Sequence, residues 1–120
     1  MNAADFIGLL FLARDVTHSA HLQTRSYAKH KALNEFYDGI IDLADNFAET
    51  YQGRHGLIGP IALAKPEKST DVVKFLQQQL AIIESNRNSV CDEDDSPLQN
   101  LIDEICERYL RTLYKLRFLA

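Results

Sequence analysis

The stretch from residue 17 to residue 35, THSAHLQTRSYAKHKALNE, holds three of the four histidines and the connection between two predicted helices. Residues 3–23 contain no proline, and apolar residues recur there at helical spacing. Thr24 and Ser26 can each cap a following helix, because a hydroxyl accepts a hydrogen bond from a free backbone N–H. We therefore predict a helix that ends near residue 23, a turn centred on Arg25, and a second helix over residues 26–52 that Gly53 terminates.

Two more helices are predicted in the second half of the chain. Residues 53–68, GRHGLIGPIALAKPEK, contain three glycines and two prolines and indicate an irregular crossover. A third helix is expected to open at Ser69 or Thr70, with Asp71 at its positive end. Residues 96–99, SPLQ, predict a serine cap, a proline in the first turn and a capping-box glutamine for the fourth. Residues 1–120 are thus predicted to form one all-α domain, an antiparallel four-helix bundle with a longer crossover between helices two and three.

The overall composition indicates a globular protein and narrows its partners. Of the 120 residues, 46% are hydrophobic and 25% charged, and the net charge of −4 argues against non-specific binding to nucleic acid. Cys91 and Cys106 form no CxxC pair, so a reducing compartment is expected. The apolar run FIGLLFLA, residues 6–13, is too short to span a bilayer and lacks the preceding basic residues of a signal peptide. We expect a cytoplasmic protein with no membrane partner.

The predicted second helix is apolar on two sides. One stripe consists of Leu33, Phe36, Ile40, Leu43 and Phe47, and the other of Tyr37, Ile41, Ala44, Ala48 and Tyr51. Because a bundle needs only one such side, the second predicts a homo-oligomer that assembles through this helix.

Symmetry would also decide which polar residues can meet. Glu49 lies roughly 28 Å from His30 along a straight helix, so one chain cannot bring them together. Two chains can, if their second helices pack antiparallel about a two-fold axis near Gly39. His30 of one chain would then approach Asp45 and Glu49 of the other.

The histidines near the turn have three possible roles. His18 lies roughly 10 Å before the turn and His30 roughly 8 Å after it, so both are expected at about the same level. Asp15 and Asn34, each one turn away, would extend a polar layer. Polar packing of the hairpin, metal binding and contacts to an anionic ligand all remain open, whereas His21 is expected at solvent or an interface.

The spacing of His18, His30, Asn34, Asp45 and Glu49 across two helices resembles that of the Dps branch of the ferritin-like proteins. The resemblance implies a ferritin-like bundle that holds iron, or another divalent metal, between subunits. His18 and His30 of one chain and Asp45 and Glu49 of its partner would be the ligands. Asn34 stands where that family has a bridging acid, and Asn is a weaker ligand for a hard metal. We therefore expect a degenerate, non-catalytic site rather than a working ferroxidase.

A second resemblance covers residues 11–59, which are similar to a group of small bacteriophage proteins. It implies a phage-encoded protein that works in the host cell, and phages encode helical oligomers that sequester nucleotide signals of host immunity. On this alternative, an interface pocket would hold a small anionic nucleotide through His18, His21, Arg25, Tyr27, Lys29, His30, Tyr37 and Arg54. A bundle that is purely structural, or that binds a host protein, is a third alternative.

Overall fold

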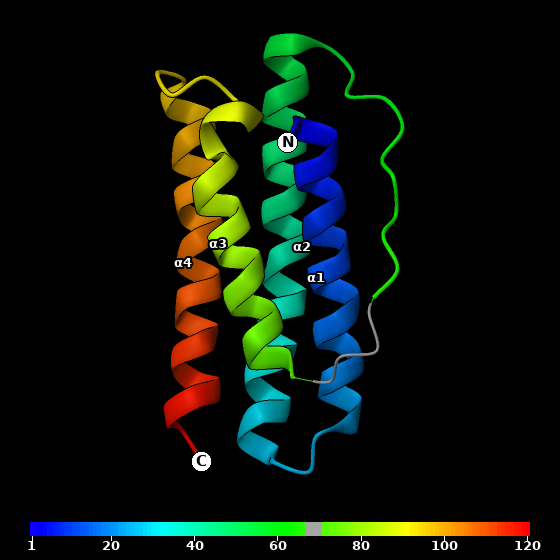
Figure 1. Cartoon of the computed structure of the whole chain (residues 1–120), viewed down its shortest axis with the longest axis vertical. Coiled ribbons are helices and arrows are strands. Elements are labelled where there is room, and N and C mark those ends of the chain that lie inside the picture. Colours follow the sequence, from blue (N-terminus) through cyan, green and yellow to red (C-terminus); the bar gives the residue numbers. More distant parts are fainter. Residues whose placement is uncertain (67–70) are drawn as a thin grey trace.

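The computed structural model of the protein describes residues 1–66 and 71–120 and is all-α over those ranges (Figure 1). Its helices are α1 (Ala3–Gln23), α2 (Tyr27–His55), α3 (Val72–Val90) and α4 (Ser96–Phe118). Ser69 and Thr70, the predicted start of the third helix, lie outside the described residues. None of these four helices combines the length and the apolar character needed to cross a membrane.

Each helix begins with a side chain that accepts a hydrogen bond from the first turn. Asn2 and Asp5 form a reciprocal capping box at the start of α1. Ser26 caps α2 as predicted, its hydroxyl accepting from the Lys29 N–H, and Asp71 caps α3. These polar caps explain why the helices begin where they do.

Three predicted details of the helix ends are wrong. α2 continues through Gly53 to His55 and ends at Gly56, whose φ of 88° suits glycine. Asp95, not Ser96, caps α4, because its carboxylate accepts from the Leu98 N–H. The side chain of Gln99 does not close a capping box but accepts from Arg87 Nε at 2.7 Å, which ties α4 to α3.

The helices form a ring in which α1 contacts α2 and α3, and α4 contacts the same two helices. Contacts at their ends show that neighbours run in opposite directions (Figure 1). Ser89 near the end of α3 donates to the Met1 carbonyl, and Arg54 at the end of α2 pairs with Asp95 at 2.7 Å. The crossover from α2 returns along α1 to the start of α3 (Figure 1).

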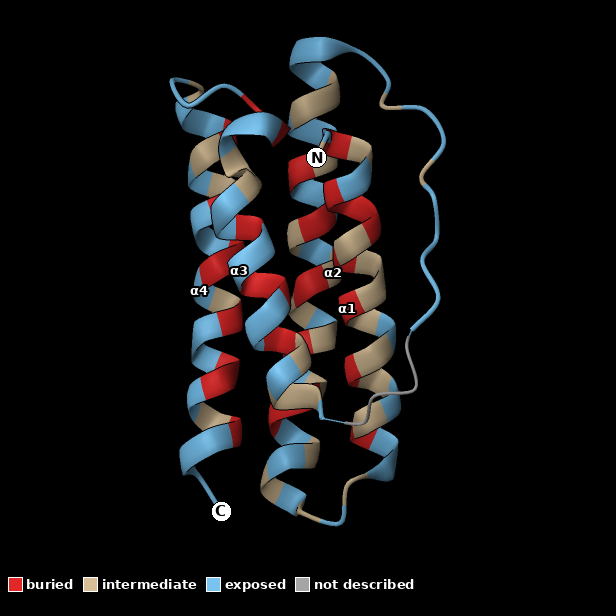
Figure 2. Cartoon of the chain, viewed as in Figure 1, coloured by how far each residue is buried: buried red, intermediate tan, exposed pale blue. Residues whose placement is uncertain are grey.

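The core is an aliphatic and aromatic column along the bundle axis (Figure 2). Phe6 packs edge-on against Phe47, and Phe36 against Tyr109, with centroid distances of 4.9 and 5.0 Å. The second stripe of α2 also packs within one chain: Ala44 is buried, and Ile41, Ala48 and Tyr51 are half-buried against the core. This stripe therefore does not by itself require another subunit.

One polar chain crosses the core between three helices. The Tyr109 hydroxyl of α4 donates to Gln79 Oε1 of α3 at 2.5 Å, and Gln79 Nε2 donates to the Leu9 carbonyl of α1 at 3.1 Å. Both side chains are buried, and removal from water raises the pKa of Tyr109 well above its ordinary value. The neutral hydroxyl therefore remains a donor, and these bonds fix the level of α3 against α1.

Candidate functional site

Two histidines clasp the hairpin between α1 and α2. His21 Nδ1 donates to the His30 carbonyl at 2.7 Å, and His30 Nδ1 donates to the His21 carbonyl at 2.8 Å. A carbonyl can only accept, so each Nδ1 carries a hydrogen. The two rings stack with centroids 3.6 Å apart and planes 20° from parallel. The pair joins the two helices one turn beyond their connection.

The sequence predicted His18 and His30 at about the same level and His21 at solvent or an interface, whereas the structure places His21 against His30 inside the chain. His21 is only 7% exposed and is the residue that faces His30. Because α1 ends at Gln23 and α2 begins at Tyr27, His21 and His30 are nearly equidistant from the middle of the connection. His18 lies about one turn too far along α1 to take that place.

His18 instead stacks on Tyr37, with ring centroids 4.2 Å apart. The Tyr37 hydroxyl donates to Asn34 Oδ1 at 2.7 Å, and Asn34 Nδ2 donates to Asp38. The side chain of Arg14 lies 6.0 Å from the Tyr37 ring and pairs with Asp15 at 2.9 Å. The predicted polar layer therefore exists as a network of packed rings and local hydrogen bonds.

The clasp is not a chelate in this geometry. A ring nitrogen bonds a metal through a lone pair in the plane of its ring, at about 2.0–2.1 Å. Planes stacked as closely as those of His21 and His30 direct their lone pairs side by side rather than toward one point. Over the described parts of the chain, no three histidine, cysteine or acidic side chains gather as a metal site would require.

A metal site shared between chains stays a prediction, and the structure bears on its acidic ligands and on the predicted axis at Gly39. Asp45 and Glu49 are exposed on α2, as that site would need. Gly39 is covered by α4, since a Cβ there would lie 3.0 Å from the Arg108 guanidinium carbon. The missing side chain at Gly39 thus makes room for Arg108 of the same chain, where a two-fold axis was predicted.

The residues predicted to grip an anion are divided between the two ends of the bundle. Arg25, Tyr27 and Lys29 are exposed beside the clasp, and Lys31 lies over the Tyr27 ring at 5.6 Å. Arg54 lies at the far end of α2, roughly 40 Å away, where it pairs with Asp95. One chain therefore cannot bring all eight predicted ligand residues into one pocket.

A groove that the sequence did not reveal lies between α1, α3 and the crossover. Its volume is about 580 Å³, within the range of small-molecule pockets. Its apolar walls come from Leu9, Leu12 and Val16 of α1, Phe75 and Ile82 of α3, and residues 62–64 of the crossover. Asp5, Lys65, Lys74, Gln78 and Gln79 are its polar lining residues.

The crossover approaches α1 closely at one end of this groove. A Cβ at Gly8 would lie 2.7 Å from the Ala62 carbonyl oxygen, so a larger residue would push the crossover away. A cluster of glycines and prolines was the only sequence signal for this segment, and it indicates irregular backbone without showing which helices the segment covers. The groove depends on three segments that are distant in the sequence.

Comparison with known proteins gives the chain a family. A model of a family of unknown function (DUF5856) matches residues 21–116, from the clasp to the end of α4. The chain belongs to this family. No solved structure matches it.

The DUF5856 chain also has a relative in a bacteriophage. It is 33% identical over 115 residues to the 14.6 kDa protein of the mobD-ri intergenic region of Enterobacteria phage T4. The match covers 95% of this chain and 87% of the phage protein. A small phage protein is therefore supported, as the resemblance of residues 11–59 implied.

Proposed function

We propose that this protein is a non-catalytic binding protein that holds a small amphipathic anion in the groove between α1, α3 and the crossover. The observation that supports the proposal is an apolar groove whose lining includes two lysines. Aliphatic walls favour an unbranched hydrocarbon chain, because burying apolar surface is the main source of affinity in such pockets. The ligand class that fits is an alkyl carboxylate.

The lining charges favour one orientation of the ligand. Leu9 and Gln79 are hydrogen-bonded and α1 and α3 run in opposite directions, so Asp5 and Lys74 lie on opposite sides of that contact. Their separation along the groove is roughly 14 Å. Lys65 follows Ala62 on the crossover, which runs alongside α1 toward the Lys74 end (Figure 1). A carboxylate would be attracted to the lysine end and repelled by Asp5.

The lining of the groove suits an aliphatic ligand better than a nucleotide. Among the described residues that line it, Phe75 is the only aromatic one, whereas a nucleobase usually stacks between aromatic or planar side chains. The rings near the hairpin, which could stack on a base, already stack on one another.

Titration calorimetry with dodecanoate tests the proposal on the intact chain. We expect saturable one-site binding, and no comparable binding of dodecyltrimethylammonium, which has the same tail and the opposite charge. Lys74→Met should weaken dodecanoate about two- to fivefold, since it removes one exposed charge contact. Lys29→Met, which removes an exposed lysine beside the clasp, should leave the affinity unchanged.

A second variant tests the apolar wall. Val16→Trp would fill the groove from α1 and should abolish binding without changing the helical circular dichroism spectrum. Equal binding of the cationic and anionic detergents, or dodecanoate affinity that survives both variants, would rule out this ligand class. Binding of a cyclic or ADP-ribose-type nucleotide in the same assay, with loss on Val16→Trp, would replace it with the nucleotide alternative.

A further inference from the structure

An unpartnered apolar stripe runs along the outside of α4. Leu110, Tyr114 and Phe118 are spaced four residues apart and are 57%, 55% and 66% exposed. At this spacing the three side chains lie on one face of the helix. The core side of α4, which includes Ile102, Ile105 and Tyr109, is separate and buried. α4 therefore carries a second apolar face that nothing in residues 1–66 or 71–120 covers.

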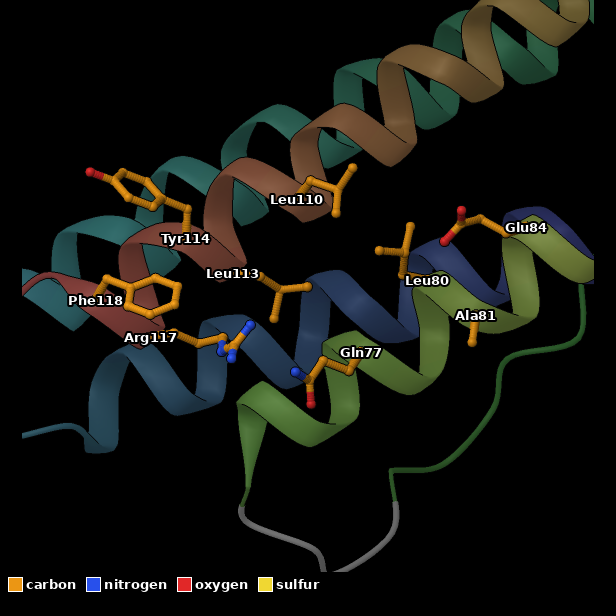
Figure 3. Close-up of a pocket in the computed structure, with 9 residues that line it drawn as sticks. All are labelled: Gln77, Leu80, Ala81, Glu84, Leu110, Leu113, Tyr114, Arg117 and Phe118. Atoms are coloured by element: carbon orange, nitrogen blue, oxygen red, sulfur yellow. The ribbon is translucent and has the colours of Figure 1, made fainter.

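The stripe forms one wall of a groove whose other wall is α3 (Figure 3). Leu80 and Leu113 are buried between the two helices. The small side chain of Ala81 leaves the α3 wall of the groove shallow. The groove measures about 430 Å³, and its apolar residues are contiguous rather than scattered. Contiguous exposed apolar surface of this kind marks interaction sites in soluble proteins.

Charged residues of opposite sign stand toward the two ends of this groove. Arg117 of α4 lies toward the Gln77 end, and its guanidinium is 4.9 Å from the Phe118 ring (Figure 3). Glu84 of α3 lies at the other end, near Leu110 (Figure 3). Glu84 is seven residues from Gln77, so the two charges are separated by roughly 10 Å along the helices.

We propose that the α3–α4 face is the contact between two copies of this chain, related by a two-fold axis that passes near Leu80 and Leu110, midway between Arg117 and Glu84 (Figure 3). Such an axis exchanges the two ends of the groove, so Arg117 of each copy meets Glu84 of the other. Leu80, Leu110 and Leu113 of the two copies then cover each other between these two ion pairs, and Tyr114 and Phe118 extend the contact at both ends. A patch with one charge at each end and apolar residues between them is complementary to itself, which favours a second copy over an unrelated protein.

The size of the molecule is compatible with this contact. The bundle measures 44 × 25 × 22 Å, so a lengthwise face can supply the ~800 Å² per partner that a standard interface buries. The other charged pair beside the stripe, Glu107 with Arg111 at 3.7 Å, is neutralised within one helix and adds no net repulsion. This contact uses α3 and α4, and it leaves α2 and the groove next to α1 free.

Sedimentation equilibrium over a range of concentrations measures the proposed dimer. Leu110→Lys places two lysines together at the axis and should weaken the dimer by at least about thirtyfold, because like charges then face each other in the interface. Thr50→Lys adds the same charge on the exposed surface of α2 and should change nothing. Circular dichroism shows whether each variant keeps its helices.

A charge exchange gives an independent measurement. Glu84→Arg and Arg117→Glu should each weaken the dimer, because each places like charges together. The double variant should restore it, since the swapped charges again pair across the axis. A chain that stays monomeric at all concentrations, a dimer that Thr50→Lys breaks and Leu110→Lys does not, or a double variant no better than the single ones would overturn the proposal.

Discussion

The hydrogen bond between Tyr109 and Gln79 connects α4 to α3 inside the core. Tyr109 is fully buried and packs on Phe36, so its hydroxyl has no access to water. A buried acceptor left without a donor costs about 1–3 kcal/mol. The pair is therefore a sensitive point of the fold, and its Gln79 also lines the groove beside α1.

Tyr109→Phe should lower the free energy of unfolding by about 1–3 kcal/mol, because it strips the donor from Gln79 Oε1 and leaves that oxygen buried. Urea denaturation measures the change. Gln79→Met in the same background should recover part of the loss, since both partners are then apolar. Tyr27→Phe removes a hydroxyl that is exposed and should be neutral. A loss as large in Tyr27→Phe would show that the buried bond is not the cause.

At the scale of the helices, local signals in the sequence predicted most of what is observed. The end of α1 at residue 23, the Ser26 cap and the four helices are confirmed, because caps and apolar periodicity act within a few residues. The predicted end of α2 at Gly53 is wrong because a glycine inside a helix costs only about 1 kcal/mol, and other contacts stabilise α2. The predicted capping box is wrong because the Gln99 side chain accepts a hydrogen bond from Arg87 of α3 instead.

The candidate sites were less predictable for a physical reason. Whether His30 meets His18 or His21 depends on a shift of one helical turn, which a sequence does not determine when the connection is known only to within a few residues. The groove beside α1 depends on the packing of the crossover at Gly8. The exposed stripe on α4 has the same apolar spacing as a core face, and only the positions of the neighbouring helices distinguish the two.

His21→Ala and His30→Ala should each destabilise the hairpin by about 1–2 kcal/mol, because each removes one side-chain hydrogen bond to a carbonyl and the ring stacking. Thermal unfolding followed by circular dichroism measures both. The double variant should lose less than the two single losses together, since the partners act as one unit. His55→Ala, which changes an exposed histidine, is the control.

The same experiment separates the clasp from the metal hypothesis. A clasp held by hydrogen bonds should give one melting temperature in EDTA and in added ferrous iron or zinc. A rise in melting temperature on adding metal that disappears in His30→Ala and in Asp45→Ala would instead support ligands shared between subunits.

At the scale of the whole molecule, the two cysteines make stability depend on pH in the alkaline range. Burial raises the pKa of the Cys106 thiol to about 11 and also raises that of Cys91. In the unfolded chain a thiol ionises near pH 8.5. Between these values the unfolded state releases a proton that the folded state keeps, so the free energy of unfolding falls as pH rises.

The free energy of unfolding from urea titrations should therefore be flat near pH 7.5 and decline between about pH 8.5 and 11, with up to about 3 kcal/mol of the decline due to Cys106. Cys106→Ala should show a shallower decline, whatever its stability at neutral pH, because it lacks the thiol that titrates. Tyr27→Phe removes an exposed phenol and should keep the parent slope. If Cys106→Ala declines as steeply as the parent, the thiol is not protected from ionisation by the fold, and the alkaline loss of stability must come from the other groups that titrate there, Tyr109 among them.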